Sequence, residues 1–551
     1  MLGISIAYAK GPVACGLQSQ QDMRSVVVLA ALVVLVSPAH ARRSGLLREL
    51  AHRVTTRLAE RRADRFMRHL ARRENAFYQP GVGLDGRTGM TFDGVNIDFR
   101  TGKPLENRNW SAPSKESLHV AMLVKAVAGD RTARTLFSPN PRRPKLGAGR
   151  ALTILERKIA TYERFNRDYP GFGGFLPWYR VSDGRVEPQG KGKDGWQTRV
   201  PGLDNGQLAW SLYYAANTLE ALGHTDLARR YRAQLNLMQE NVVRIFYDPA
   251  AKKMRAEASL LRGNRRAPGK NAYALNPDNP YYLDDPYEGL MLCHFADLFG
   301  NWSAHPEGRQ AIWSTPRREP ATYRIRAPGQ PKLDGKRVTI ARSWVGSSHE
   351  DWGELFLPFT DVKLARTLFE NTQRVRTLHS ATRGIPGLFA STHRPTDGET
   401  PTEYVSKLGF TGSSATLDRA VSQRIVAPYA AFPLALARGG RATFAAWLRT
   451  MVKAPRMLGP YGMGESCSTD GKGMAPCLTW DGKALPMLAW MGGIRDDVRS
   501  YLKRDGLYGQ FVRRVEGDLR LFKGRPVEGT DLPLATPTAK VPHGMNGFER
   551  R

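Results

Sequence analysis

The sequence predicts an all-α protein built as an α/α barrel, in which outer helices surround a ring of inner helices. From about residue 114 onward, segments with helical apolar spacing alternate with loops. Some segments are apolar on nearly every side, as in GQLAWSLYYAANTLEAL, and must be buried, whereas others keep a polar face, as in DLARRYRAQLNLMQENVVRIF. A long α-solenoid is the alternative, but the chain lacks a 34- or 40-residue repeat.

The expected elements follow from this periodicity. Helices are predicted at 114–128, 149–168, 205–222, 225–246, 285–299, 350–359, 362–380, 425–438, 441–454 and 482–492. Residues 320–344 alternate enough to form a small β-hairpin insertion. The loops between the helices are long and rich in Trp, Tyr, Gly and Asp, which is typical of functional loops.

The N-terminus resembles a targeting segment. A stretch that starts at Met23 carries one arginine, continues through an apolar run and ends in Ala39-His40-Ala41. We therefore expect a signal peptide over residues 1–41, with Met23 as an alternative start, and export to the periplasm or the medium. An uncleaved anchor is the alternative, although the apolar run is short for a membrane span.

The rest of the chain divides by composition into three parts. Residues 42–112 form a basic helix followed by a loop extension, residues 113–515 form the barrel, and residues 516–551 form a charged, Pro-rich tail that wraps or dangles. The 551 residues carry a formal charge of +31, much of it near the ends. Because no zinc finger, RNP-type strand or basic–aromatic stripe is present, we expect no nucleic-acid partner. The charge suits a polyanionic environment, including loose envelope or membrane association through the basic helix.

Three cysteines follow the predicted cleavage site. Cys467 and Cys477 bracket a short loop and are expected to form a disulfide in an oxidising compartment, whereas Cys293 is expected to be a buried thiol. No CxxC or His-rich pattern occurs, so neither a metal nor a cofactor is predicted.

Acidic residues recur at the expected starts of inner helices, as in PGLDNGQLAW, DDPYEGLML and SSHEDWGELF, and again in the loop GPYGMGES. Capping is one interpretation, because several of these acids fit the spacing of a capping box and a cap contributes about 1 kcal/mol. The other is functional, because inner helices of an α/α barrel start at the same end and their acids converge. The acids are Asp204, Asp285, Glu288, Glu350, Asp351, Glu354 and Glu465.

Aromatic residues from the same loops would line the resulting pit. They are Trp178, Tyr179, Trp196, Tyr287, Trp352, Tyr461 and Trp480. Aromatic surfaces with scattered carboxylates suit a neutral, hydroxyl-rich ligand such as a sugar. Cleavage of a glycosidic bond requires one carboxylic acid that stays protonated and one ionised carboxylate. Glu288, beside an apolar helix, is the candidate acid, and Glu465 is the candidate ionised partner.

Three motifs, VPGLDNGQLAWSLYYAANTLEALG, IVAPYAAFPLALA and LGPYGMGES, resemble the bacterial glucoamylase-like (glycoamylase) domain. That domain is similar to endo-β-1,2-glucanases and to the transglycosylase module of cyclic β-1,2-glucan synthases. The resemblance covers about residues 145–500 and implies an (α/α)6 barrel that hydrolyses or transglycosylates β-linked glucan, most plausibly β-1,2-glucan.

The resemblance also implies roles for single residues. In it Glu288, in PYEG, is the general acid, and Glu465, in GPYGMGES, is the base. Glu354, in GELFLPF, has a substrate-binding or catalytic place, and Asp204 could replace Glu465 as the second carboxylate. Two rivals remain: a polysaccharide lyase or epimerase on the same barrel, and a non-catalytic envelope glycan-binding protein. His349 is the only histidine within the acid-bearing motifs.

Overall fold

The computed structural model describes residues 41–190, 196–261, 272–284, 289–398, 403–410 and 424–549. The chain divides into two units, residues 1–64 and 65–551. The predicted signal peptide, apart from Ala41, lies outside the described residues. Helix α2 (Ala41–Glu74) is the predicted basic helix; it begins in the first unit and ends in the second.

The second unit is helix-rich, and its helices fall into the two predicted classes. Helices buried over almost their whole surface are α3 (Pro113–Val127), α6 (Gly202–Ala221), α8 (Leu290–Phe299), α10 (Gly353–Phe356), α13 (Phe432–Leu436) and α15 (Trp480–Trp490). Helices that bury one face are α5 (Leu146–Asp168), α7 (Thr225–Phe246), α11 (Lys363–Thr382), α14 (Arg441–Val452), α16 (Arg495–Arg504) and α17 (Tyr508–Asp518). Short α4 (Arg131–Phe137) and α9 (Gly308–Ala311) complete the set.

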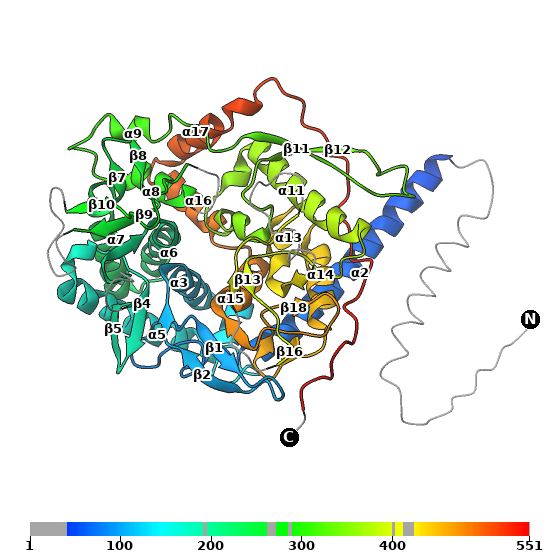
Figure 1. Ribbon diagram of the computed structural model, residues 1–551, viewed down its shortest axis with the longest axis horizontal. Coiled ribbons are helices and arrows are strands. Elements are labelled where there is room, and N and C mark those ends of the chain that lie inside the picture. Colours follow the sequence, from blue (N-terminus) through cyan, green and yellow to red (C-terminus); the bar gives the residue numbers. More distant parts are fainter. Residues whose placement is uncertain are drawn as a thin grey trace, which may run out of the picture. The chain divides into compact units, whose positions relative to one another are not determined.

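The buried helices pack against one another. Helix α3 contacts α6 and α15, α6 contacts α8 and α10, and α13 contacts α10 and α15. Figure 1 shows α3 and α6 side by side. Half-exposed helices cover them: α5 packs on α3, α7 on α6 and α14 on α13. The apolar periodicity therefore separates inner from covering helices.

Two predicted helices are wrong as single helices. The one expected at 350–359 is divided into a 3-10 turn at Ser348–Asp351, the four-residue α10 and a 3-10 turn at Phe359–Asp361. Residues 425–438 were expected to form a single helix, but they form strand β15 (Ile425–Val426), a 3-10 turn at Pro428–Ala431 and the short α13. Pro428 and Pro433 lack the N–H that a continuous helix requires at those positions, so the segment restarts at each.

Small antiparallel sheets were underpredicted. Three have three strands: β1 (Gly94–Ile97), β2 (Pro104–Arg108) and β19 (Cys477–Thr479); β3 (Trp110–Ser111), β4 (Tyr179–Ser182) and β5 (Arg185–Pro188); and β6 (Arg199–Pro201), β9 (Glu257–Leu260) and β10 (Tyr273–Leu275). Five are pairs: β7 (Tyr247–Asp248) with β8 (Lys253–Met254), β11 (Pro320–Arg324) with β12 (Arg337–Ala341), β13 (Thr392–His393) with β14 (Tyr404–Val405), β15 with β18 (Cys467–Ser468), and β16 (Leu458–Gly459) with β17 (Gly462–Met463). The pair β11–β12 is the predicted hairpin. Strands β3, β6 and β19 lead into α3, α6 and α15, so the sheets fix where these buried helices start.

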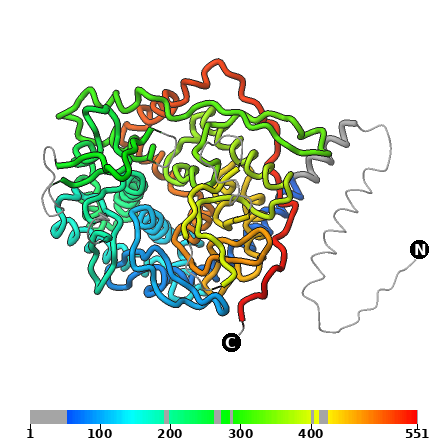
Figure 2. The backbone as a smooth tube through the Cα atoms, viewed as in Figure 1, coloured from blue at the N-terminus to red at the C-terminus, as the bar shows by residue number. Residues whose placement is uncertain are grey.

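The C-terminal tail wraps the second unit. Leu532 joins a buried apolar cluster with Tyr323 and Val338, and the Trp447 indole donates a hydrogen bond to the Ala535 carbonyl. Figure 2 shows this segment in red, following the surface of the unit to the C-terminus.

Candidate active site

The starts of α3 and α15 meet at an ion-paired cluster. Lys115 Nζ lies 3.3 Å from Asp481 Oδ2 and 3.9 Å from Asp93 Oδ1, and Arg108 Nε lies 2.9 Å from Asp93 Oδ2. Burial lowers the pKa of Lys115, but Asp481 and Asp93 outweigh it and the net pKa is raised. Burial raises the pKa of Asp93 against the opposing charges of Lys115 and Arg108.

Asp481 stands in the first turn of α15, where the local fold leaves its carboxylate available. The N-cap is Thr479, whose hydroxyl accepts from the Gly482 N–H, so Asp481 is not needed as the cap. Asp481 is 7% exposed, and its Oδ1 is buried without a hydrogen-bond partner among the described residues. Buried polar atoms are normally satisfied, so a ligand hydroxyl or a water is expected to complete this oxygen.

The start of α6 adds Asp204 to the same place. Asp204 Oδ2 accepts a 2.8 Å hydrogen bond from the Trp178 indole. The Asp204 charge is also among those that raise the pKa of Lys115. Trp178 stacks on Trp110 with ring centroids 5.4 Å apart and an interplanar angle of 11°. No side chain caps α6, so the predicted capping box between Asp204 and Gln207 is wrong. Three helix starts therefore lie together, and they carry Asp204 of α6, Lys115 of α3 and Asp481 of α15.

Glu288, with Asp285 and Tyr287, lies outside the described residues. The residues that follow Glu288 are described: α8 begins at Leu290 and packs on α6. A Cβ added at Gly206 would lie 2.7 Å from the Leu292 nitrogen, so only glycine allows this close approach. The segment after Glu288 is thereby fixed beside the helix that carries Asp204.

Glu465 lies at the start of α15, where it contacts Thr479. It lies between β17 and β18, is 2% exposed, and accepts hydrogen bonds from Thr479 Oγ1 at 2.7 Å and Thr392 Oγ1 at 3.2 Å. Burial raises its pKa, but the His393 charge and these hydrogen bonds outweigh burial and the net pKa is lowered. An ionised Glu465 fits the prediction, yet its contacts anchor the Thr479 cap of α15.

His393 connects Glu465 to the cluster. Its Nδ1 lies 3.7 Å from Glu465 Oε1, and its Nε2 lies 3.0 Å from Arg108 Nη2. Tyr404 packs edge-on over the His393 ring, with centroids 5.5 Å apart. Polar contacts thus run from Glu465 through His393 and Arg108 to Asp93.

The remaining predicted acids gather at a cavity of about 100 Å³ that Glu350, Asp351 and Glu354 line together with Leu290 and Arg318. Burial raises the pKa of Glu350 to about 7, of Asp351 to about 6 and of Glu354 to about 7. Glu350 accepts from the Val345 and Gly346 N–H groups, and Asp351 accepts from Gln373. Because Leu290 starts α8, carboxyl groups with raised pKa values lie near the segment that follows Glu288.

Three predicted sugar-binding aromatics are core residues, so their assignment is wrong. Tyr179, Trp352 and Trp480 are 0%, 1% and 0% exposed. The Trp480 indole donates to the Gly83 carbonyl, and the Tyr179 hydroxyl donates to Glu116. Trp178 and Tyr461 are partly exposed and remain candidates, and the side chain of Trp196 lies outside the description.

The predicted disulfide is also wrong. Cys467 and Cys477 are both buried thiols, as is Cys293. Cys467 pairs with Val426 in the β15–β18 sheet, whereas Cys477 pairs with Asn96 in the β1–β19 sheet, so the two cysteines belong to different sheets. The Cys477 side chain hydrogen-bonds with His393 instead.

Sequence reasoning missed Asp481, Lys115, Asp93 and His393. The motif TWDGKA carries the same signal as the other helix starts, a hydroxyl cap followed by an acid in the first turn. The helix was predicted to begin at residue 482, which excluded Asp481. Asp93 lies in an irregular segment and His393 in the two-residue strand β13, and only the tertiary fold brings them to α15.

Two searches of the described residues concern other site types. No group of three or more His, Cys, Asp or Glu side chains within the described ranges could hold a metal ion. Among the helices of these ranges, none combines the length and the apolar composition needed to cross a membrane.

Comparison with known proteins now adds the family. The family model "Endo-beta-1,2-glucanase SGL" matches residues 90–550. An endo-β-1,2-glucanase from Talaromyces funiculosus in complex with sophorose is 32% identical, with a TM-score of 0.78 over 87% of this chain and 94% of that one. A Glu-to-Gln mutant of that enzyme with β-1,2-glucan is 31% identical, with a TM-score of 0.80 over 89% of this chain and 96% of that one.

A more distant structure agrees in fold. The endo-β-1,2-glucanase from Chitinophaga pinensis, with sophorotriose and glucose, is 13% identical, with a TM-score of 0.51 over 83% of this chain and 97% of that one. No curated protein sequence matches the chain. The family match confirms the resemblance drawn from the motifs: this chain is a glycoside hydrolase of the endo-β-1,2-glucanase family.

Proposed function

We propose that this protein is an exported (α/α)6-barrel hydrolase that cleaves β-1,2-glucan, with residues 113–515 as its catalytic domain. The cluster in which Lys115 joins Asp481 to Asp93, with Asp204 nearby, carries the proposal. Charged groups from three helix starts meet there beside partly exposed indoles. The packing of α3 on α6 and α15, of α6 on α8 and α10, and of α13 on α10 and α15 supports a closed ring of inner helices.

Glu288 is the proposed general acid, as the resemblance implies, and the geometry favours Asp481 over Glu465 as the second carboxylate. Both Glu465 oxygens accept hydrogen bonds from threonines, so Glu465 serves to hold the α15 start. Asp481 has an oxygen without a hydrogen-bond partner in the part of the chain that the structure describes, and a lysine 3.3 Å away that stabilises its charge. An ionised carboxylate of this kind can activate water for glycoside cleavage.

Sugar binding is assigned to the exposed edge of the cluster. Trp178 and Trp110 form a stacked pair, and Asp204 fixes the Trp178 indole. Such a surface can pack against the C–H face of a glucose ring, while Asp204 accepts hydrogen bonds from its hydroxyls. Export through residues 1–41 completes the proposal; fractionation of cells that express the full chain would test it, and retention of all activity in the cytoplasm would contradict it.

The function itself is tested by reducing-sugar release from β-1,2-glucan, β-1,3-glucan and alginate. The proposal expects release from β-1,2-glucan and its loss in Glu288→Gln, with the thermal unfolding temperature kept. Cleavage of alginate would favour a lyase, and no release from any polymer would favour a glycan-binding protein. A Glu288→Gln protein that melts earlier but retains its turnover rate would reduce Glu288 to a helix cap.

A further inference from the structure

A second cavity, of about 720 Å³, lies at the C-terminal tail of the second unit. Its walls come from the end of α2, the turn after β1, the segment that joins α14 to β16, and the tail. The residues that matter for its chemistry are Arg73, Lys103, Lys453, Arg456, Phe548 and Glu549. None of them belongs to the cluster around Asp481. The volume falls within the range of small-molecule sites, roughly 300–1,000 Å³.

The cavity has a surplus of positive charge. Four of its lining residues are cations, and its one acid, Glu549, is already engaged by Arg100 through hydrogen bonds of 2.9 and 3.0 Å. Lys103 and Lys453 are exposed and have no recorded acidic partner among the described residues. The surrounding protein therefore leaves most of this charge uncompensated.

Arg456 is held in place by the protein at an energetic cost. Its backbone is left-handed, with φ of 58°, a conformation that costs a non-glycine residue of the order of 1–3 kcal/mol. Its Nη1 donates 2.7 Å to the Phe99 carbonyl, its Nε donates 3.1 Å to the Asn546 carbonyl, and its guanidinium lies 4.4 Å from the Phe99 ring centroid. These contacts pre-organise a guanidinium at the cavity wall.

The tail forms an apolar side of the same cavity. Phe548 packs so closely on the turn that a Cβ added at Gly102 would lie 2.9 Å from its ring. The Glu549 N–H donates 2.9 Å to the Arg100 carbonyl, which ties the tail to the turn. Cations and an aromatic ring thus line the same cavity, which exists only because the tail is docked.

We propose that this cavity binds a phosphate ester carried on a sugar or polyol. A phosphate monoester carries about −1.5 to −2 charges near pH 7, which suits several cations better than a single carboxylate does. Arginine binds phosphate through directed hydrogen bonds, and lysine adds point charge. The Phe548 side of the cavity accommodates the carbon skeleton of the ligand.

Isothermal titration of the full chain with glucose 6-phosphate, and with glucose as the neutral control, tests the proposal. Saturable binding is expected for glucose 6-phosphate alone and weakens with added salt. The double variant Lys103→Glu/Lys453→Glu should raise the Kd by about tenfold or more. The charge-matched variant Lys332→Glu/Lys523→Glu, made at exposed lysines outside the cavity, should leave the Kd within about twofold.

Three results would overturn the proposal: no saturable binding, equal weakening by both double variants, or binding only to phosphatidylglycerol vesicles and not to glucose 6-phosphate. β-1,2-Glucan hydrolysis serves as the folding control, because Lys103→Glu/Lys453→Glu should leave its rate unchanged. Failure of the binding test therefore leaves the proposed hydrolase function untouched, and loss of hydrolysis in wild-type protein leaves the binding test intact.

Discussion

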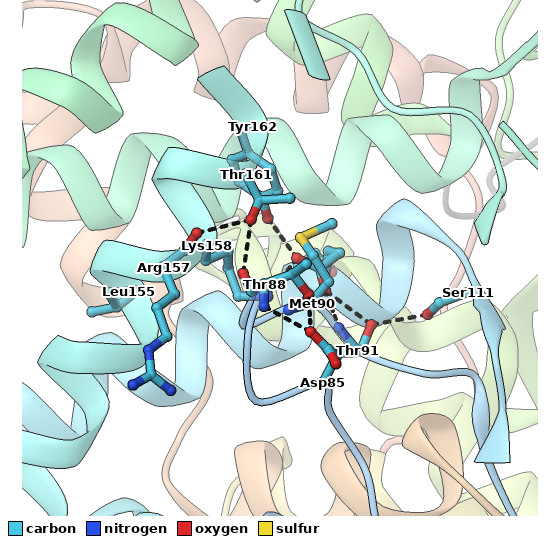
Figure 3. Close-up of polar contacts among 12 residues, drawn as sticks. Asp85, Thr88, Met90, Thr91, Ser111, Leu155, Arg157, Lys158, Thr161 and Tyr162 are labelled. Carbon is cyan, nitrogen blue, oxygen red and sulfur yellow. Dashed lines mark hydrogen bonds and ion pairs between the residues drawn. The ribbon is translucent and has the colours of Figure 1, made fainter. Parts of the chain in front are cut away.

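Two consecutive residues of α3, Lys115 and Glu116, form ion pairs of different kinds: the Glu116 pair is fully buried, whereas the Lys115 pair is partly exposed. Glu116 is fully buried and accepts hydrogen bonds from Lys158 at 2.5 Å, from Tyr162 at 2.6 Å and from the Thr91 N–H at 2.8 Å. Figure 3 shows three of its partners, Lys158, Tyr162 and Thr91, in one polar network. Burial raises the pKa of Glu116, but Lys158 and the hydrogen bonds outweigh it and the net pKa is lowered.

Lys115 belongs to a cluster that the protein leaves incomplete. Its partner Asp481 retains one oxygen, Oδ1, without a hydrogen-bond partner among the described residues, and the Lys115 side chain is 13% exposed. A buried ion pair whose hydrogen bonds are satisfied stabilises the fold, because removal of one partner leaves the other charge buried and unpaired. A pair with unsatisfied oxygens at a partly exposed edge is suited to bind a ligand. The contrast predicts that one network controls stability and the other controls activity.

Removal of the Asp481 charge should have the largest effect. Asp481→Asn keeps the shape of the side chain but removes the carboxylate, so kcat on β-1,2-glucan should fall by about 10²–10⁴-fold. The thermal unfolding temperature should change little, because Thr479 still caps α15. Steady-state kinetics and differential scanning calorimetry measure both quantities. Near wild-type turnover would remove Asp481 from the reaction.

Breaking the buried pair should affect stability instead. Lys158→Met leaves Glu116 buried without its counterion and should lower the free energy of unfolding by about 3–5 kcal/mol, measured by urea denaturation. The folded protein should keep its kcat. The matched double variant Glu116→Gln/Lys158→Met should recover part of the lost stability; no recovery would show that Lys158 contributes through packing alone.

The acids near α8 predict a pH-dependent stability. The pKa of Glu354 is about 7 in the folded state, above its ordinary value of 4.5, so the folded protein holds a proton that the unfolded chain has released between these values. Stability from this group is therefore present below about pH 4.5 and is lost as the pH rises to about 7.

Glu354→Gln removes that dependence. The variant should gain about 1–3 kcal/mol relative to wild type at pH 8 and gain nothing at pH 4, as measured by chemical denaturation at both pH values. An equal difference at pH 4 and pH 8 would refute a raised pKa as the cause.

The smallest effect is expected at the indole pair. Trp178→Phe keeps an aromatic ring but loses the hydrogen bond to Asp204, so the KM for β-1,2-glucan should rise about two- to tenfold with kcat unchanged. Trp480→Phe is the control: its indole bonds a buried carbonyl, so the unfolding temperature should fall while KM stays the same. A raised KM in Trp480→Phe, with an unchanged KM in Trp178→Phe, would place the sugar at Trp480.

Much of the helical framework could be predicted from the sequence, because apolar periodicity reports burial directly. The helix predicted at 225–246 begins and ends as observed in α7, and the all-apolar segments are the buried helices. Apart from the β11–β12 hairpin, the strands between helices escaped prediction, because strands of two to five residues show almost no alternation of apolar and polar side chains. Their pairings depend on segments distant in sequence, as with β1 and β19.

The site was only partly predictable for the same reason. Asp204 was found because it stands in a first helical turn that the sequence marks clearly. Asp93 and His393 carry no such mark, and the burial of Trp480 cannot be distinguished from exposure in a loop rich in aromatics. The sequence marks acids at helix starts as a group, but which of their oxygens the protein satisfies is a property of the tertiary structure.

The most direct test is a crystal structure of Asp481→Asn with a β-1,2-glucan oligosaccharide. The account predicts that the glucan lies across the first turns of α6 and α15, with residue 481 and Lys115 contacting the sugar or its attacking water and Trp178 against a glucose ring. A glucan bound elsewhere, with the Lys115 cluster closed beneath protein atoms, would contradict it.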